Sequence, residues 1–152
     1  PDFLKTGEYR PAKAKATLSN AMDVGDPSNF VRVLKLFNNQ FGPLRTMVSS
    51  ESISDDATID SIRRVYQNDR YLMDPHGAVG YLALKHFLQL HPGAGIFLET
   101  VHPVKFSNVV EPVTGEKIPA PESISGLLNR NKRAVFMQPD YDSLKNLLLL
   151  SY

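Results

Sequence analysis

Gly95-Ile96-Phe97-Leu98-Glu99-Thr100 is the stretch of this 152-residue sequence that most clearly predicts a β-strand. It is a short apolar run that follows a glycine and lacks the length of an amphipathic helix. Weaker strand signals occur in three other short segments, residues 16–18, 46–49 and 134–137. Because apolar runs of this length are typical of buried strands, the sequence predicts a small β-sheet.

Amphipathic patterns between these segments predict helices. The clearest covers residues 75–87, with Asp74 as its cap and Pro75 as its first residue. Another helix has Asp26 as its expected cap and Pro27 in its first turn. After this helix, Gly42-Pro43 is expected to break the chain. The helices are expected at residues 27–37, 55–66 (capped by Ser54 or Asp55), 75–87, 103–110, 119–129 and, capped by Pro139-Asp140, 141–150.

Short strands that alternate with helices are typical of an α/β fold. We therefore expect a short, mostly parallel sheet flanked by helices. The first residues are polar and irregular, so residues 1–15 are expected to form a connecting segment and residues 16–152 a single domain.

Composition narrows the possible partners and location. Apolar residues make up 42% of the chain, charged residues 22%, and the net charge is +1, which gives no reason to expect a nucleic-acid or membrane surface. The longest uninterrupted aliphatic run is Leu147-Leu148-Leu149-Leu150, far below the roughly 20 residues of a membrane-spanning helix. The chain has no cysteine, so disulfides and thiolate chemistry are excluded, and we expect a cytoplasmic protein.

Two polar segments stand where an α/β fold binds ligands. Residues 19–29 gather hydroxyls, amides and a carboxylate before a predicted helix start, whose free N–H groups favour anions. The same pattern also fits an ordinary capped helix after a loop. Thr100 ends the predicted strand, where its hydroxyl could face a ligand or cap the next helix. The four histidines lack the spacing of a zinc site.

Three stretches, taken together, resemble the threonine synthase family. The first is Ala16-Thr17-Leu18-Ser19-Asn20-Ala21-Met22-Asp23-Val24-Gly25-Asp26-Pro27-Ser28-Asn29. The second is Asp74-Pro75-His76-Gly77-Ala78-Val79-Gly80, and the third is Gly95-Ile96-Phe97-Leu98-Glu99-Thr100-Val101-His102-Pro103-Val104-Lys105-Phe106. The chain departs from the family pattern at Val101, where alanine is usual, and at Glu99, where a small residue is common. Glu99 adds a charge near the expected site.

The resemblance implies part of the large domain of a fold type II enzyme that uses pyridoxal 5′-phosphate (PLP). Such an enzyme converts O-phosphohomoserine and water into threonine and phosphate. PLP supplies the electron sink, and the protein positions and tunes it. Residues 16–152 would then be the C-terminal part of the PLP-dependent domain.

The resemblance also assigns roles to individual residues. Thr100 is expected to form a hydrogen bond with the pyridine nitrogen of PLP. His102 and Lys105 are expected to orient the site or to meet the substrate phosphate, and His76 to lie just behind the residues that touch the cofactor. The loop of residues 19–29 is expected to form a wall of the cleft, with polar contacts from Ser19, Asn20, Asp23 and Asn29.

Two parts of such an enzyme do not occur in this sequence. No lysine stands in the P-x-x-A-F-K-D context of the family's Schiff-base lysine, and the phosphate-cradling loop is absent. We therefore expect a C-terminal fragment that is inactive by itself, binds no PLP, and self-associates through its exposed cofactor-facing side. The alternative is a non-catalytic α/β module that binds a phosphorylated metabolite or a protein partner.

Overall fold

The computed structural model of the protein describes residues 2–20, 23–128 and 130–150. The chain divides into two compact units, Pro1–Pro119 and Ala120–Tyr152. The described elements, in chain order, are α1 (Asp2–Thr6), α2 (Phe30–Leu36), α3 (Phe41–Met47), α4 (Asp55–Asp69), α5 (Pro75–Leu90), the 3-10 helix η2 (Pro103–Phe106), α6 (Ser107–Thr114), α7 (Glu122–Leu128) and α8 (Tyr141–Leu150).

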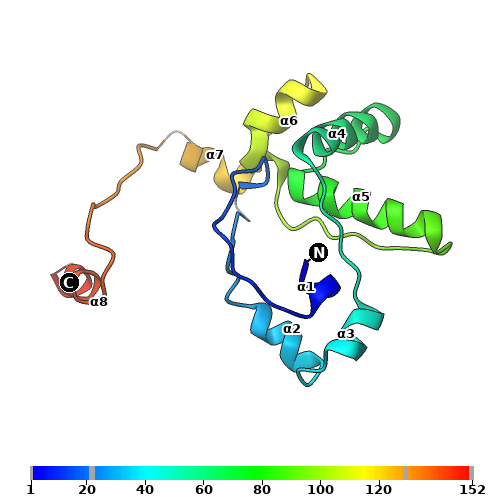
Figure 1. Ribbon diagram of the computed structural model, residues 1–152. Coiled ribbons are helices and arrows are strands. Elements are labelled where there is room, and N and C mark those ends of the chain that lie inside the picture. The colour runs from blue at the N-terminus through cyan, green and yellow to red at the C-terminus, as the bar shows by residue number, and fades with distance from the viewer. Residues whose placement is uncertain (1, 21–22, 129, 151–152) are drawn as a thin grey trace. The chain divides into compact units, whose positions relative to one another are not determined.

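The core of the first unit lies among its three central helices. α4 packs against both α5 and α6, and η2 leads directly into α6 (Figure 1). Full burial of one large apolar side chain stabilises a fold by about 1.5–3 kcal/mol. The buried side chains of this core are Ile62, Val65, Met73, Ala78, Phe106, Val110 and Ile118.

The two long helices begin at capping residues that the sequence predicts. Ser54 accepts a hydrogen bond from the N–H of Ala57 at 3.2 Å, so Ser54 rather than Asp55 caps α4. Asp74 accepts one from the N–H of His76 at 2.8 Å and caps α5, whose first residue is Pro75. The predictions of these helices and of the helix after residue 103 are confirmed.

Aromatic side chains hold the N-terminal helices together. The ring of Phe3 in α1 meets the rings of Phe30 and Phe41 edge-on, with centroid distances of 4.9 Å and 5.5 Å. Tyr9 stacks on Phe30 at 4.6 Å and donates a hydrogen bond from its hydroxyl to Asp26 at 2.7 Å. The prediction that Asp26 caps α2 is therefore wrong, since its carboxylate binds Tyr9.

The predicted break at Gly42-Pro43 is also wrong. Both residues lie in the first turn of α3. A proline is tolerated there because the first N–H groups of a helix have no partner within the helix. Thr46 and Met47 end the same helix, so they do not begin the strand predicted for residues 46–49.

The predicted parallel sheet is not found, because the described residues contain helices and extended segments but no strand. The strand predicted for residues 95–100 is wrong, because this segment runs along α5 instead of pairing with another strand (Figure 1). Phe97 packs edge-on against Tyr81 of α5 at 5.6 Å. Gly95 lies so close to Leu84 that an added Cβ would be 2.6 Å from it. An apolar run predicts burial, but here only Phe97 is partly buried, whereas Ile96 and Leu98 are 89% and 74% exposed.

The described residues of the second unit form two helices, α7 and α8, and residues 130–140 between them are exposed. Asp140 caps α8, as predicted, by accepting a hydrogen bond from the N–H of Ser143 at 2.8 Å. Residues 134–137 form no strand, and Val135 and Phe136 are 68% and 100% exposed. α7 ends at Leu128, and the predicted helix end at Asn129 lies outside the described residues.

Two further expectations concern domain limits and membranes. The connecting segment predicted for residues 1–15 stays a prediction, although its residues Asp2–Thr6 form a helix. Across the described parts of the chain, every helix is too short or too polar to cross a lipid bilayer.

Candidate functional site

The segment that carries Thr100 presents alternate residues to opposite sides. Phe97 and Val101 pack against the core of the first unit. Leu98, which points the other way, is 74% exposed, and Thr100 is exposed as well. This alternation is the ordinary geometry of an extended chain. The Thr100 hydroxyl forms no hydrogen bond with any described residue, so it is available to a ligand.

His102 and Lys105 follow on η2. His102 is the cap of this helix, because its Nδ1 accepts a hydrogen bond from the N–H of Val104 at 3.2 Å. His102, and not Thr100, therefore caps the helix after residue 100. Lys105 is exposed and forms no ion pair among the described residues.

The loop predicted as a cleft wall is held together by Asp23. Its carboxylate accepts hydrogen bonds from the N–H of Thr17 at 3.0 Å and from the Thr17 hydroxyl at 2.6 Å. The same hydroxyl lies 3.1 Å from that of Ser19. Asp23 and Ser19 are thus engaged in shaping the loop. Ala21 and Met22 of the same motif lie outside the described residues.

The side chains of Asn20 and Asn29 have no partner among the described residues. Asn29 directly precedes α2 but forms no side-chain cap bond. The loop is anchored to α4 where the N–H of Leu18 donates to Asp55 at 3.3 Å. No hydrogen bond or ion pair between described residues joins this loop to residues 100–105, so the structure leaves the two predicted halves of the site unlinked.

A third group of polar side chains, which we call the α5 cluster, consists of Asp74, His76 and Glu99. Asp74 is fully buried and lies 2.7 Å from Nδ1 of His76, measured from the same oxygen that caps α5. The ring of His76 also meets the ring of Phe106 edge-on at 5.1 Å. His76 therefore connects the start of α5 to the core behind the segment that carries Thr100.

With both carboxyl groups ionised, several polar atoms of the α5 cluster have no hydrogen-bond partner among the described residues. They are the second oxygen of Asp74, both carboxyl oxygens of Glu99 and Nε2 of His76, and all of them are buried. Burial of an unpaired polar atom costs free energy, so such atoms normally have partners. Their grouping marks the cluster as unusual within this fold.

Burial and the neighbouring Asp74 carboxyl together raise the pKa of Glu99 to about 8. Burial opposes ionisation of Asp74 too, but hydrogen bonds from Glu99 and His76 outweigh it and hold the pKa of Asp74 below its usual value. The pKa of Tyr71 is raised by burial and by the charges of Glu99 and Asp74. One proton is therefore retained on Glu99 near neutral pH.

The three members of the α5 cluster are each predicted from the sequence in a separate role, and no sequence motif brings them together. Asp74 is expected as a cap, His76 as a residue behind the cofactor contacts, and Glu99 as an extra charge near the site. A usable signal was Gly77 in the first turn of α5, because an added Cβ there would collide with the Glu99 carboxyl group. Among the described residues, no three ligand side chains come together in a way that suits a metal ion.

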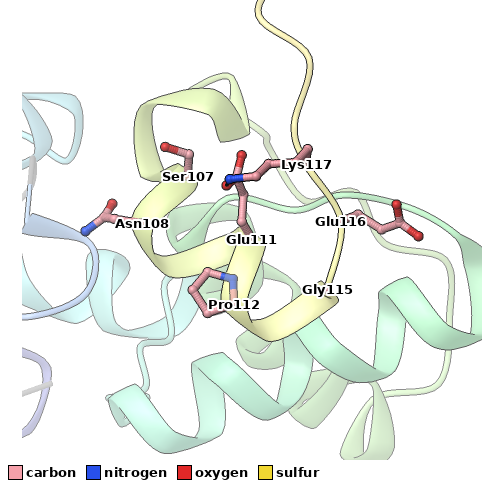
Figure 2. Close-up of a pocket in the computed structure, with 7 residues that line it drawn as sticks. All are labelled: Ser107, Asn108, Glu111, Pro112, Gly115, Glu116 and Lys117. Carbon is pink, nitrogen blue, oxygen red and sulfur yellow. Dashed lines mark hydrogen bonds and ion pairs between the residues drawn. The ribbon is translucent and has the colours of Figure 1, made fainter.

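A shallow hollow runs along α6, lined by Ser107, Asn108, Glu111, Pro112, Gly115, Glu116 and Lys117 (Figure 2). Its lysine, Lys117, is paired with Glu111 at 2.8 Å, and the same glutamate accepts the N–H of Ile118 at 3.1 Å. These bonds fasten the turn after α6 onto the helix. With its cation paired and two carboxylates in its lining, the hollow does not suit a phosphate.

Comparisons with known proteins agree on one family. The family model described as "Threonine synthase, C-terminal" matches residues 77–148. Threonine synthase of Haemophilus influenzae is 39% identical over 151 residues, which cover 99% of this chain and 35% of that protein. The enzyme of Escherichia coli is 35% identical and covers 98% of this chain. The chain thus spans about a third of the length of these relatives.

Solved structures that are similar to this chain are also threonine synthases. The crystal structure of threonine synthase from E. coli has a TM-score of 0.86 and 33% identity, covering all of this chain and 35% of that one. A PLP-bound threonine synthase from Brucella melitensis has a TM-score of 0.62 at 24% identity, a likeness that shows the fold alone.

Proposed function

This chain belongs to the threonine synthase family as its C-terminal region, and on that premise we propose that the protein carrying it forms threonine and phosphate from O-phosphohomoserine and water. The proposal is supported by the three ordered motifs and by relatives that are named threonine synthase along almost the whole chain. A cytoplasmic location is part of the proposal.

The cofactor of the proposed reaction is PLP, which is named in the description of one similar structure. When bound, PLP supplies an electron sink for charge that develops on the substrate. The unbonded hydroxyl of Thr100 carries the proposal, because it is exposed at the end of the extended segment and free to donate to the pyridine nitrogen. A neutral hydroxyl does not hold a proton on that nitrogen, as a carboxylate would, and so it moderates the sink.

The contacts of each side chain in the structure support the remaining proposed roles. Lys105 is free of ion pairs and suits the substrate phosphate, while His102 shapes the turn between Thr100 and Lys105 through its cap bond. Asn20 and Asn29 have free amides that suit contacts in the cleft. Asp23 and Ser19 act by holding the loop that carries those amides.

No lysine of this chain stands in the context of the family's Schiff-base lysine. We therefore propose that this lysine and the phosphate loop are contributed by the remaining two thirds of the enzyme. The 152-residue chain expressed alone is then inactive. Treatment with PLP and borohydride should leave no PLP covalently attached to any of its lysines. A labelled lysine in that chain, found by peptide mass spectrometry, would contradict this proposal.

The proposed role of Thr100 is tested in the full-length enzyme with Thr100→Val and Thr100→Ser. Loss of a hydrogen bond between two neutral groups, at about 0.5–1.5 kcal/mol, corresponds to roughly a 2- to 10-fold lower kcat for the valine variant. The serine variant keeps the hydroxyl and recovers most of the activity. Thr46→Val is the matched control, because Thr46 bonds only to backbone within α3. Wild-type activity and an unchanged PLP absorption spectrum in Thr100→Val would overturn the assignment.

The exposed apolar side of residues 96–100 also supports a proposal about association. Ile96 and Leu98 are 89% and 74% exposed, and exposed apolar patches favour contact with other protein surfaces. We expect the 152-residue chain alone to self-associate through this side, and Ile96→Lys to weaken the association. Light scattering that shows a monomer at high concentration would contradict this expectation.

A further inference from the structure

The buried contact between Glu99 and the start of α5 needs a proton to be stable. The Glu99 carboxyl group lies against Gly77 and beside Asp74, whose backbone N–H interacts with it, and no side chain among the described residues donates a hydrogen bond to the ionised group. Two ionised carboxylates accept hydrogen bonds but cannot donate them, and they repel each other. A single shared proton removes the repulsion and gives each group a partner.

The bonds of Asp74 decide where this proton lies. One oxygen of Asp74 already faces two donors from His76, the backbone N–H at 2.8 Å and Nδ1 at 2.7 Å. These bonds stabilise the ionised form of Asp74. The other oxygen is buried and has no partner. The proton therefore belongs on Glu99, with the free oxygen of Asp74 as its acceptor.

We propose that Glu99 is a positioning residue, whose protonated carboxyl group donates a hydrogen bond to Asp74 and so fastens residues 95–101 to the start of α5. Its neighbour Thr100 points to the opposite side of the extended chain. A fixed Glu99 thus holds the Thr100 hydroxyl outward in one orientation. The pairing itself is independent of the proposed function, whereas its consequence for Thr100 rests on that function.

No lysine or arginine among the described residues lies in an ion pair that could compensate a negative charge on Glu99. Asp74 and His76 face it from the start of α5, and Tyr71 faces it from the preceding loop. η2 and α6 contribute Phe106 and Val110 to the adjoining core, and both are apolar and buried. Deprotonation of Glu99 therefore leaves a buried negative charge without compensation, which releases the segment.

Hydrogen–deuterium exchange of the full-length protein tests this proposal on the peptide that covers residues 74–80, the start of α5 against which Glu99 lies, where the N–H of Ala78 donates to the carbonyl of Asp74 at 3.0 Å. In the wild type, once exchange is corrected for its intrinsic pH dependence, protection should fall by up to roughly tenfold per pH unit between about pH 6 and pH 8. The Glu99→Gln amide donates a hydrogen bond at every pH, so protection should be independent of pH in that variant. Glu116→Gln is the control, because Glu116 is exposed and lies outside the α5 cluster.

The same slope in Glu99→Gln and in the wild type, or no slope in the wild type, would overturn the proposal. A second measurement covers the case in which Glu99→Gln fails to fold. Asp74→Asn removes the charge that holds the proton on Glu99, so the fall in protection should shift to lower pH; an unshifted fall contradicts the pairing. If Thr100→Val proves neutral while these slopes appear as expected, the role of Thr100 fails and the carboxyl pair stands.

Discussion

The carboxyl group of Glu99 occupies the space beside the α-carbon of Gly77 in the first turn of α5, where a Cβ would collide with it. Glycine in a helix usually costs about 1 kcal/mol relative to alanine, because it loses more backbone entropy on folding. Here glycine leaves room for a buried carboxyl group from the segment that bears Thr100.

Gly77→Ala should therefore expel the Glu99 carboxyl group from its contact with Asp74. Protection of residues 74–80 against hydrogen exchange is expected to be reduced already at about pH 6, and its dependence on pH to disappear. The matched control is Gly80→Ala in the same helix, since a Cβ there meets only the Cβ of Phe97 at 4.0 Å. That control should keep the wild-type pH dependence and gain up to about 1 kcal/mol in stability.

The raised pKa of Glu99 also predicts how stability depends on pH. Glu99 holds its proton up to about pH 8 in the folded chain, against an ordinary value of 4.5 when unfolded. As the pH rises, the unfolded chain releases this proton first, so the contribution of Glu99 to the free energy of unfolding falls from about pH 4.5 to about pH 8 and is constant above it. Urea unfolding across this range should show the fall in the wild type, and a smaller one in Glu99→Gln. Equal profiles would exclude a raised pKa.

Phe106 should be among the residues that stability depends on most. Its ring is 4% exposed, belongs to the core of the first unit and contacts His76. Phe106→Ala leaves a cavity and is expected to cost about 3–5 kcal/mol in the free energy of unfolding. Phe136→Ala is the control, because Phe136 is fully exposed and should change stability by less than about 0.5 kcal/mol. A similar small loss in both variants, measured by denaturant titration, would show that this core is not formed.

The cap of α4 gives a smaller, separate effect. Ser54→Ala removes the acceptor for the N–H of Ala57 and is expected to destabilise the protein by about 1 kcal/mol. Ser52 precedes the same helix but forms no hydrogen bond with a described residue, so Ser52→Ala should be neutral. Thermal unfolding of the two variants side by side measures the difference. An equally small shift in both would mean that water replaces the cap bond at no cost.

Local signals predict the two long helices α4 and α5 well, but they miss α1 and α3. α5 was expected from Asp74, Pro75 and its apolar spacing, and each of these features acts within one turn of the helix start. The same kind of signal predicts a strand at residues 95–100, and this segment instead lies along α5 without a partner strand. Its pairing could not be predicted in this way, because a strand needs a partner and an apolar run equally suits the side of a helix.

The candidate site likewise has features that short motifs predict and features that depend on contacts between distant segments. The exposed Thr100 and the cap role of Asp74 could be predicted from short motifs. The pairing of Asp74 with Glu99 could not, since it depends on how closely the segment after α5 approaches the start of that helix. Only Gly77 pointed to this approach, and glycine also occurs in helices where no other chain segment comes near.

The volume shared by residues 77 and 99 also sets the order in which the protein could change. Starting from this chain, Gly77→Ala first expels a carboxyl group, whereas Glu99→Ala first opens a gap that alanine at position 77 can then fill. The effects of the two substitutions should therefore be non-additive. Gly77→Ala should be harmless only after Glu99→Ala has removed the carboxyl group. The two positions behave as one unit of sequence change, although they lie on different elements.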